Sequence, residues 1–271
     1  MTDLSIIISG AAGRMGRAIV REAAAASNIR LAGAIEHAQS PDLGRDVGAV
    51  AGLDDLGVIV ATAGDATLAD ADVVIDFSAP AAAVALAQAA SKAGVAHVIG
   101  ATGFSDAQEA VIAKAAATIP IVKSGNMSLG VNLMTALVEQ AAKALPDDYD
   151  IEIIDIHHRH KVDAPSGTAL MIGEAAASGR GRALDDAAVG FDTGRAGARE
   201  PGQIGFAVLR GGGVIGEHEA HFAGPHEVLT VSHRAIDRSL FARGAITAAR
   251  WVATRPPGLY SMRDVIGLNQ D

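Results

Sequence analysis

The chain has 271 residues, 49% of them hydrophobic, and a formal net charge of −9. This composition is typical of a globular protein, and its acidic balance argues against nucleic acids and anionic membranes as partners. The lack of cysteine excludes disulfides, thiolate metal sites and cysteine nucleophiles. Because the sequence shows neither a signal-peptide pattern nor an apolar run of roughly 20 residues, we expect a cytoplasmic protein without a membrane segment.

The first half of the chain alternates short β-branched runs with alanine-rich segments of helical period. This alternation is typical of repeated βα units. The expected strands are residues 4–9, 30–35, 58–61, 73–77, 95–99 and 120–122, and the expected helices are residues 13–26, 80–93 and 106–118. The pattern predicts an α/β fold with a doubly wound parallel sheet.

The second half has a different texture. A helix at 128–145 precedes a strand at 151–157 and a helix at 166–178, for which Ser166 is the expected N-cap. Residues 179–205 are rich in glycine and charge, so we expect a long mobile loop and a candidate lid. Three strand-like runs follow between 204 and 235, separated by hairpin-like turns at 211–213 and 223–225, before a last helix at 239–253. This half is expected to be α+β.

A glycine-rich sequence lies directly between the first expected strand and the first expected helix. It contains Gly10, Gly13 and Gly16, the spacing of a dinucleotide-binding turn in which the backbone approaches the pyrophosphate. Glu36, at the end of the second strand, fits the carboxylate that holds the adenosine ribose. Two more strand ends, residues 100–103 and 124–127, fall where open parallel sheets bind ligands. Ordinary turns and a solvated carboxylate are the alternative interpretation.

Residues 152–169 concentrate titratable side chains between a strand and a capped helix. Because side chains alternate along a strand, His157 and His158 face opposite sides and cannot do the same job. Residues 166–168 open a helix whose N–H groups and hydroxyls suit a carboxylate, and Lys161 adds a cation. The pattern favours acid–base chemistry on a small anionic substrate.

Other interpretations of this segment remain open. His157, His158 and His160 would have to converge to bind a metal ion, and the H-E-x-x-H pattern is absent. A solvated basic loop is a second alternative. A serine hydrolase is disfavoured because Ser166 lacks a G-x-S-x-G elbow. The later histidines are expected to be structural residues on sheet faces; they are His218, His221, His226 and His233.

With these motifs the sequence resembles the dihydrodipicolinate reductase family over nearly its whole length. The resemblance is carried by residues 10–16, 100–103, 126–132, 152–169, 202–206, 216–218 and 262–265. The histidine–lysine–Pro-Ser-Gly-Thr motif is highly specific, whereas many dehydrogenases share the glycine loop. The resemblance implies a Rossmann-like dinucleotide-binding domain, residues 1–128 plus 238–271, with an inserted α+β substrate-binding and tetramerisation domain, residues 129–237.

The resemblance also implies an activity. This is NAD(P)H-dependent reduction of 4-hydroxy-tetrahydrodipicolinate in lysine and diaminopimelate biosynthesis, with hydride transfer to C4 of the cyclic dicarboxylate after loss of water. By matching position, His157 and Lys161 would transfer protons, His158 would contact substrate, and Gly167 and Thr168 would form a carboxylate cradle. The implied cofactor contacts are Gly10, Ala11, Ala12, Gly13, Arg14, Met15, Glu36, Gly100, Ala101, Thr102, Ser124, Gly125, Asn126 and Met127. We expect no metal ion, and a homotetramer.

Position 37 is the departure from the family that bears on cofactor choice. His37 stands where several relatives carry an arginine able to hold the 2′-phosphate of NADPH; Ala101 and Met127 also depart, at backbone-contact turns. Glu36 favours the ribose hydroxyl of NADH, although Arg14 and Arg17 can attract the extra phosphate. We therefore expect use of both NADH and NADPH, with a preference for NADH.

Two alternatives from other classes stay open. Within enzymes, the chain could be another two-domain NAD(P)-dependent dehydrogenase of amino-acid metabolism, acting on a different amino-acid precursor. It could also be a non-catalytic nucleotide-binding Rossmann protein, which would need the glycine loop but not the residues around Lys161.

Overall fold

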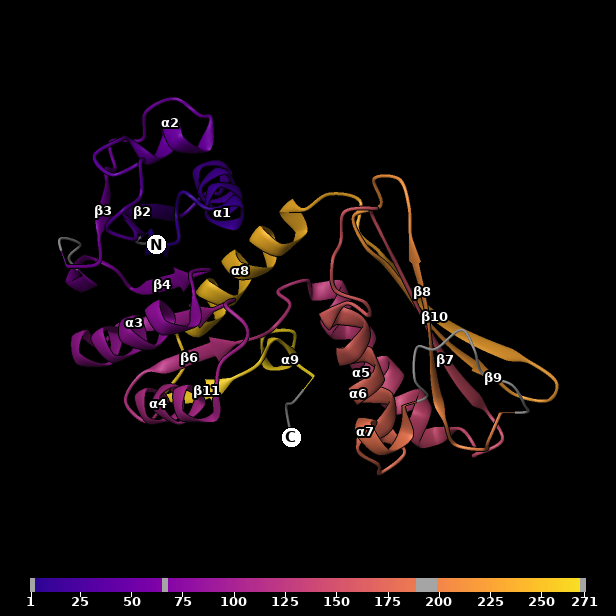
Figure 1. Cartoon of the computed structure of the whole chain (residues 1–271). Helices are drawn as coiled ribbons and strands as arrows, with labels where there is room; N and C mark the ends of the chain where they lie inside the picture. The colour runs from indigo at the N-terminus through magenta and orange to yellow at the C-terminus, as the bar shows by residue number, and fades with distance from the viewer. Residues whose placement is uncertain (1–2, 65–67, 189–198, 269–271) are drawn as a thin grey trace. The chain divides into compact units, whose positions relative to one another are not determined.

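The computed structural model describes residues 3–64, 68–188 and 199–268, which fold into two compact units (Figure 1). Unit 1 comprises Met1–Ser128 and Ser239–Asp271, and unit 2 comprises Leu129–Arg238. The chain therefore leaves unit 1 once, forms unit 2, and returns to complete unit 1. Among the described residues, no helix combines the length and the hydropathy that crossing a membrane requires.

Unit 1 is built on a seven-stranded sheet in which every pairing is parallel, in the order β11-β6-β5-β4-β1-β2-β3. Its strands are β1 (Leu4–Ser9), β2 (Ile29–Glu36), β3 (Val60–Thr62), β4 (Val73–Asp76), β5 (Ala96–Ile99), β6 (Pro120–Lys123) and β11 (Gly258–Tyr260). The strand order reverses at β1, which lies between β2 and β4. The prediction of a doubly wound parallel sheet is confirmed, and the reversal is where such sheets bind ligands.

Helices cover both faces of this sheet. They are α1 (Arg14–Ala25), α2 (Val47–Ala51), α3 (Pro80–Ala93), α4 (Asp106–Ala116), α8 (Ser239–Val252) and α9 (Met262–Val265), with a 3-10 turn, η1, at Leu68–Asp70. Three successive residues of β1, Ile6, Ile7 and Ile8, are buried, as expected for a strand covered on both sides. Helix α1 packs against α8, and α3 packs against α4. The returning segment therefore completes the helical cover of unit 1.

Unit 2 is a four-stranded mixed sheet with helices on one face (Figure 1). Its strands, in the order β10-β9-β7-β8, are β7 (Asp150–His157), β8 (Ile204–Arg210), β9 (Glu217–Ala223) and β10 (Val228–Arg234). Its helices are α5 (Leu129–Ala144), α6 (Gly167–Gly179) and α7 (Leu184–Ala187). Alternate side chains of β7 are buried, so one face of the sheet packs with α5 and α6 in a single core.

The expected hairpin at residues 211–213 is wrong. Strands β8 and β9 both pair with β7, which lies between them, with β8 parallel and β9 antiparallel to it. The connection from β8 to β9 therefore passes over the end of β7, where Gly211 N donates a hydrogen bond to His157 O at 2.9 Å. Local turn signals cannot reveal which strand intervenes. The second expected hairpin, between β9 and β10, is confirmed.

The expected loop at 179–205 contains structure at both of its ends. Helix α7 forms within it, and Ala188 makes an isolated bridge to Ile204. Near its end, Arg199 Nη2 donates to Ile151 O at 2.8 Å, and the same guanidinium pairs with Glu152. The middle of the candidate lid, residues 189–198, lies outside the described residues.

Candidate active site

The glycine-rich loop, residues 10–16, joins the carboxyl end of β1 to α1. Gly10 has a φ of +72°, and a Cβ there would lie 3.0 Å from Phe77 O. A Cβ on Gly16 would lie 2.1 Å from Gly10 O, so a larger residue cannot fit at this approach of α1 to the loop. Both positions therefore need glycine. The close packing that glycine allows places the first turn of α1, with its backbone N–H groups, next to the position expected for a pyrophosphate.

Glu36 ties the end of β2 to this loop. Its carboxylate accepts hydrogen bonds from Ala12 N at 2.9 Å and from His37 N at 3.1 Å. The Glu36 side chain is 9% exposed, whereas the His37 side chain is 65% exposed. Glu36 therefore contacts the glycine-rich loop directly, and His37 is accessible at the same strand end.

A cavity of about 940 Å³ opens between these elements and α3. Among the residues expected to bind a cofactor, the four that line it are Gly10, Ala12, Gly13 and Glu36. The rest of its lining includes His37, Asp42, Phe77 and apolar residues of α3, such as Leu86. Its volume lies at the upper end of the range of small-molecule and cofactor pockets.

The other expected cofactor residues lie elsewhere around the carboxyl edge of the sheet and do not line this cavity. Ala11 is a buried residue of the glycine-rich loop, and Arg14 and Met15 lie in the first turn of α1. Residues 100–102 follow β5, and residues 124–127 follow β6. Ser124 N donates to Ile99 O at 3.1 Å, so these two strand ends lie side by side.

Arg17 is engaged rather than open to a phosphate. Its Nε donates to Ala12 O at 2.7 Å, and its Nη2 lies 3.2 Å from Asp42 Oδ2. Arg45 pairs with the other oxygen of the same carboxylate. Asp42 therefore balances two arginines at the wall of the cavity, which weakens the expected attraction of Arg17 for a 2′-phosphate.

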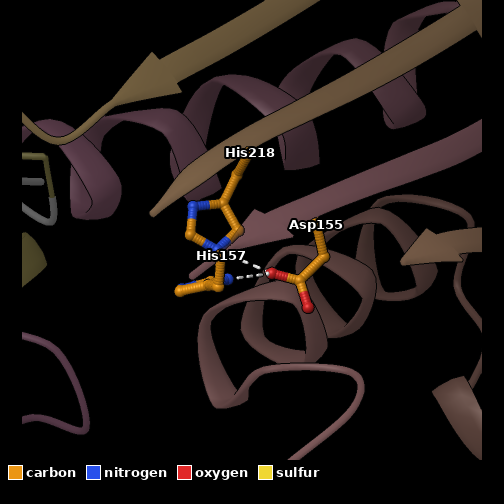
Figure 2. Close-up of side chains that lie close together, drawn as sticks. All are labelled: Asp155, His157 and His218. Atoms are coloured by element: carbon orange, nitrogen blue, oxygen red, sulfur yellow. Dashed lines mark ion pairs between the residues drawn. The ribbon is translucent and has the colours of Figure 1, made fainter. Parts of the chain in front are cut away.

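In unit 2, two histidines converge on one carboxylate at the end of β7 (Figure 2). His157 Nδ1 lies 2.8 Å from Asp155 Oδ1, and His218 Nε2 lies 3.4 Å from the same oxygen. Asp155 and His157 share the buried face of β7, and the register of β9 places His218 directly opposite Asp155. We call these three residues the Asp155 cluster.

Asp155 also accepts hydrogen bonds from outside the cluster. Ser166 donates through its backbone N at 2.8 Å and through its Oγ at 2.9 Å, and Arg210 donates through Nη2 at 3.1 Å. Burial by itself would raise the pKa of Asp155, but its contacts with His157, His218, Ser166 and Arg210 outweigh that penalty and hold the pKa well below its usual range. Asp155 is therefore an ionised carboxylate at neutral pH.

The loop after β7 carries Lys161 and His158. Lys161 Nζ lies 2.9 Å from Asp163 Oδ1, and this lysine lowers the pKa of Asp163. His158 Nε2 lies 3.2 Å from Arg238 Nη2, and desolvation together with that guanidinium lowers the pKa of His158. The lowered pKa keeps this imidazole neutral at physiological pH, and its Nε2 accepts from Arg238, because a guanidinium can only donate.

The expected alternative of a three-histidine metal site does not form. His157 faces the buried side of the sheet, whereas His158 and His160 lie on the loop, with their ring centroids 6.3 Å apart. Asp155, His157 and His218 do bring three ligand atoms within 4.8 Å of one another. Asp155, however, already accepts hydrogen bonds from the Arg210 guanidinium and from two donors of Ser166. A carboxylate surrounded by donors in this way is better placed to orient the His157 imidazole than to bind a metal ion.

Ser166 is the N-cap of α6, as predicted, because its Oγ accepts from Ala169 N at 3.1 Å. It is not arranged as a hydrolase nucleophile. Its hydroxyl donates to Asp155, and its contact with His218, 3.2 Å, uses the same Nε2 that faces Asp155. At the expected carboxylate cradle, an added Cβ on Gly167 would meet nothing within 4 Å, so the start of α6 is open at this residue.

Sequence reasoning missed His218 and Arg210 as members of this site. The alternation of buried residues in β9 places His218 on a buried face, as expected, but its partner is decided by the pairing of β9 with β7. Arg210 is the last residue of β8 and lies 55 positions after Asp155 in the sequence. A prediction of the strand order would have been the signal needed to find both.

Unit 1 has the fold of the Rossmann-like class of nucleotide-binding proteins, with a glycine-rich loop at the strand-order reversal, and unit 2 is an insertion with an acid–base cluster. Two family models described as dihydrodipicolinate reductase, N-terminus and C-terminus, match residues 4–127 and 130–266. The chain belongs to the dihydrodipicolinate reductase family.

Curated relatives agree over the full length. The chain is 55% identical over 267 residues to a 4-hydroxy-tetrahydrodipicolinate reductase of Parvibaculum lavamentivorans, covering 98% of each chain. It is 54% identical over 271 residues to 4-hydroxy-tetrahydrodipicolinate reductase 1 of Mesorhizobium japonicum, again covering 98% of each.

Solved structures show the same fold. A dipicolinate-bound dihydrodipicolinate reductase from Paenisporosarcina sp. TG-14 has a TM-score of 0.79 at 24% identity, covering 98% of this chain and 100% of that one. An amine dehydrogenase from Mycobacterium smegmatis has a TM-score of 0.59 at 14% identity, covering 96% and 95%. The two-unit architecture is therefore shared with dehydrogenases of other substrates.

Proposed function

We propose that this chain reduces 4-hydroxy-tetrahydrodipicolinate to tetrahydrodipicolinate with a reduced nicotinamide nucleotide, in lysine and diaminopimelate biosynthesis. The observation that carries this proposal is the geometry of unit 2. There, one buried carboxylate contacts both His157 and the N-cap of the helix that begins with the carboxylate cradle. Full-length identity of 55% to a curated reductase supports the same assignment.

The residues of unit 1 fit the nucleotide. Gly16 allows α1 to pack closely against the loop, because a Cβ there would lie 2.1 Å from Gly10 O, and Glu36 contacts Ala12 N beside the cavity. We assign the cofactor contacts to the loop, to Glu36 and to the strand ends at 100–102 and 124–127, on residues 1–128 plus 238–271 as the dinucleotide-binding domain. When bound, the nicotinamide would supply a hydride to C4 of the substrate, after the 4-hydroxyl group has left as water.

Residues 129–237 form the substrate domain in this proposal. Gly167 and Thr168 bind a substrate carboxylate with backbone N–H groups and a hydroxyl, and His158 contacts the substrate. Lys161 donates the proton that neutralises the reduced ring, and His157 donates or accepts a proton beside it. No step in this scheme requires a metal ion.

We propose that both NADH and NADPH are used, with a preference for NADH. Two features of the cavity support the preference. Glu36 places a carboxylate beside the expected position of the ribose, and Asp42 holds Arg17 and Arg45 in ion pairs. Neither arginine is then free to offer its full charge to a 2′-phosphate.

We further propose a cytoplasmic homotetramer that assembles through unit 2. The register pairs Leu209 with Ile156 and Val228 with Ala223, which places all four on the face of the sheet opposite α5 and α6. Leu209 is 51% exposed and Val228 is 58% exposed. Apolar side chains on an open sheet face favour sheet-to-sheet association, and light scattering of the purified protein measures the resulting mass.

The activity is tested with purified protein and substrate generated in situ by its synthase. The absorbance of NADH or NADPH should fall only when both substrate and protein are present. Nucleotide binding without substrate-dependent oxidation would support the non-catalytic alternative. Oxidation or reduction with a different amino-acid precursor alone would support another dehydrogenase.

A further inference from the structure

We propose that Asp155 is a positioning residue that holds His157 in a single tautomer and fixes its place relative to the carboxylate cradle. This rests on the proposed role of His157 in proton transfer, and it adds a residue that itself touches no substrate. Asp155 is completely buried, with 0% of its surface exposed, so it acts only through the groups around it.

Both oxygens of Asp155 are occupied by donors from different elements. Oδ1 lies 2.8 Å from His157 Nδ1 and accepts from Ser166 Oγ at 2.9 Å, and His218 Nε2 approaches it at 3.4 Å. Oδ2 accepts from Ser166 N at 2.8 Å and from Arg210 Nη2 at 3.1 Å. The carboxylate therefore joins β7, β8, β9 and the start of α6 at one point.

This arrangement selects one tautomer of His157. An ionised carboxylate repels a nitrogen lone pair that lies 2.8 Å away and attracts an N–H group, so it favours the tautomer of His157 in which Nδ1 carries the hydrogen. The other nitrogen, Nε2, is then the atom that can exchange a proton. It points toward Gly216, where an added Cβ would lie 3.0 Å away, so the lack of a side chain at Gly216 keeps that nitrogen uncovered.

The second contact of Asp155 sets the distance between the imidazole and the cradle. Ser166 donates twice to Asp155 and at the same time caps α6, the helix that begins with Gly167 and Thr168. Arg210 extends the link, because its Nη2 also donates to Asp163 O at 2.8 Å, on the loop that carries Lys161. Loss of the carboxylate would therefore loosen the imidazole and the anion-binding turn together.

The test compares Asp155→Asn with a matched control, Glu219→Gln. Glu219 also pairs a carboxylate with a histidine on the same sheet, its Oε2 lying 2.7 Å from His221 Nε2, but its side chain lies on the opposite face of β9. We expect Asp155→Asn to lower kcat by about 10²–10⁴-fold, the range for a misplaced proton-transfer group. NADH affinity should stay unchanged, and Glu219→Gln should leave kcat and KM as in the wild type.

A spectroscopic readout separates positioning from general destabilisation. In ¹⁵N imidazole NMR spectra of the unliganded wild type, assigned with His157→Gln, His157 should appear as the Nδ1–H tautomer, and in Asp155→Asn it should become a tautomer mixture. If the variant does not fold, the wild-type spectrum still decides. A wild-type Nε2–H tautomer, or a folded Asp155→Asn enzyme as fast as the control, overturns the proposal.

A wild type without substrate-dependent activity would instead overturn the proposed function, while the tautomer measurement would still test Asp155.

Discussion

His157 and Lys161 are held in very different ways. His157 is buried against a carboxylate, whereas Lys161 contacts Asp163, whose side chain is 52% exposed. An ion pair with so exposed a partner is weak, so the ammonium can turn toward a bound substrate. One residue is thus fixed in place and the other is free to move, which suits two distinct proton-transfer roles.

Removing either group should slow the chemical step. We expect Lys161→Ala and His157→Ala each to lower kcat by about 10²–10⁴-fold, because each removes a positioned proton-transfer group. His160→Ala is the matched control from the same loop and should have little effect. Steady-state kinetics measures all three, with NADH binding as a check on folding. A larger loss in His160→Ala than in the other two would refute the assignment.

Asp155 should also make the protein sensitive to acid. Its folded-state pKa lies well below the ordinary aspartate value of 3.8, so its contribution to stability is present above that value and is lost as the pH falls below it. While the folded carboxyl stays ionised, the loss is about 1.4 kcal/mol per pH unit. Denaturant unfolding at about pH 6 and about pH 3 should therefore show a smaller drop in stability for Asp155→Asn than for the wild type. An equal drop would show that Asp155 does not titrate in this way.

Position 37 should control the choice between the two nucleotides. His37 is 65% exposed beside Glu36, and arginine there would add a permanent planar cation that matches a phosphate. We expect His37→Arg to move the ratio of kcat/KM toward NADPH by about tenfold, or about 1.4 kcal/mol. The ratio is measured for both proteins with both nucleotides. An unchanged ratio would mean that residue 37 does not face the ribose.

The glycine-rich loop depends on close packing between elements. An added methyl at Gly16 would lie 2.1 Å from Gly10 O and 2.6 Å from Ala11 Cα, and neither backbone atom can move without displacing the loop from α1. We therefore expect Gly16→Ala to lower the melting temperature and to weaken NADH binding by at least about tenfold, the loss of roughly one good hydrogen bond to a charged group. Calorimetry and fluorescence titration measure the two effects.

Gly64→Ala is a suitable stability control for that substitution. Its added methyl would lie 3.9 Å from its nearest neighbour, Thr62 Oγ1, which is ordinary contact. We expect its melting temperature to stay close to that of the wild type. If Gly16→Ala bound NADH as tightly as the wild type, the loop would not hold the pyrophosphate.

Long periodic elements could be predicted from the sequence, and short ones could not. Strand β1 and helix α3 have the predicted bounds, because apolar runs and a proline at the first turn mark them clearly. Helices α2 and α9 and strand β11 were missed, since elements of five, four and three residues carry no measurable period. After the last predicted helix, the chain pairs with β6 as β11 and then forms α9.

The candidate site was predictable in part for a similar reason. His157, Lys161 and Ser166 lie within one continuous segment, so their chemistry can be read locally. His218 joins them only because β9 pairs with β7 in a register that places it opposite Asp155. Strand order is a long-range property that local patterns do not determine.

At the scale of the whole molecule, the chain separates two tasks. Unit 1 holds the glycine-rich loop and its cavity, and unit 2 holds the Asp155 cluster and the proposed carboxylate cradle. Each unit has its own hydrophobic core. The proposed nucleotide site and the proposed acid–base site therefore belong to units that are each stabilised by a core of their own.

The most direct test of this account follows the hydride itself. The wild-type protein is given NADH doubly deuterated at C4 of the nicotinamide, together with substrate generated in situ by its synthase, and the product is analysed by mass spectrometry and NMR. We predict that the product carries one deuterium, bonded to its C4. A product without deuterium, or NADH that remains unoxidised while substrate is present, would contradict the assignment of this chain as a reductase.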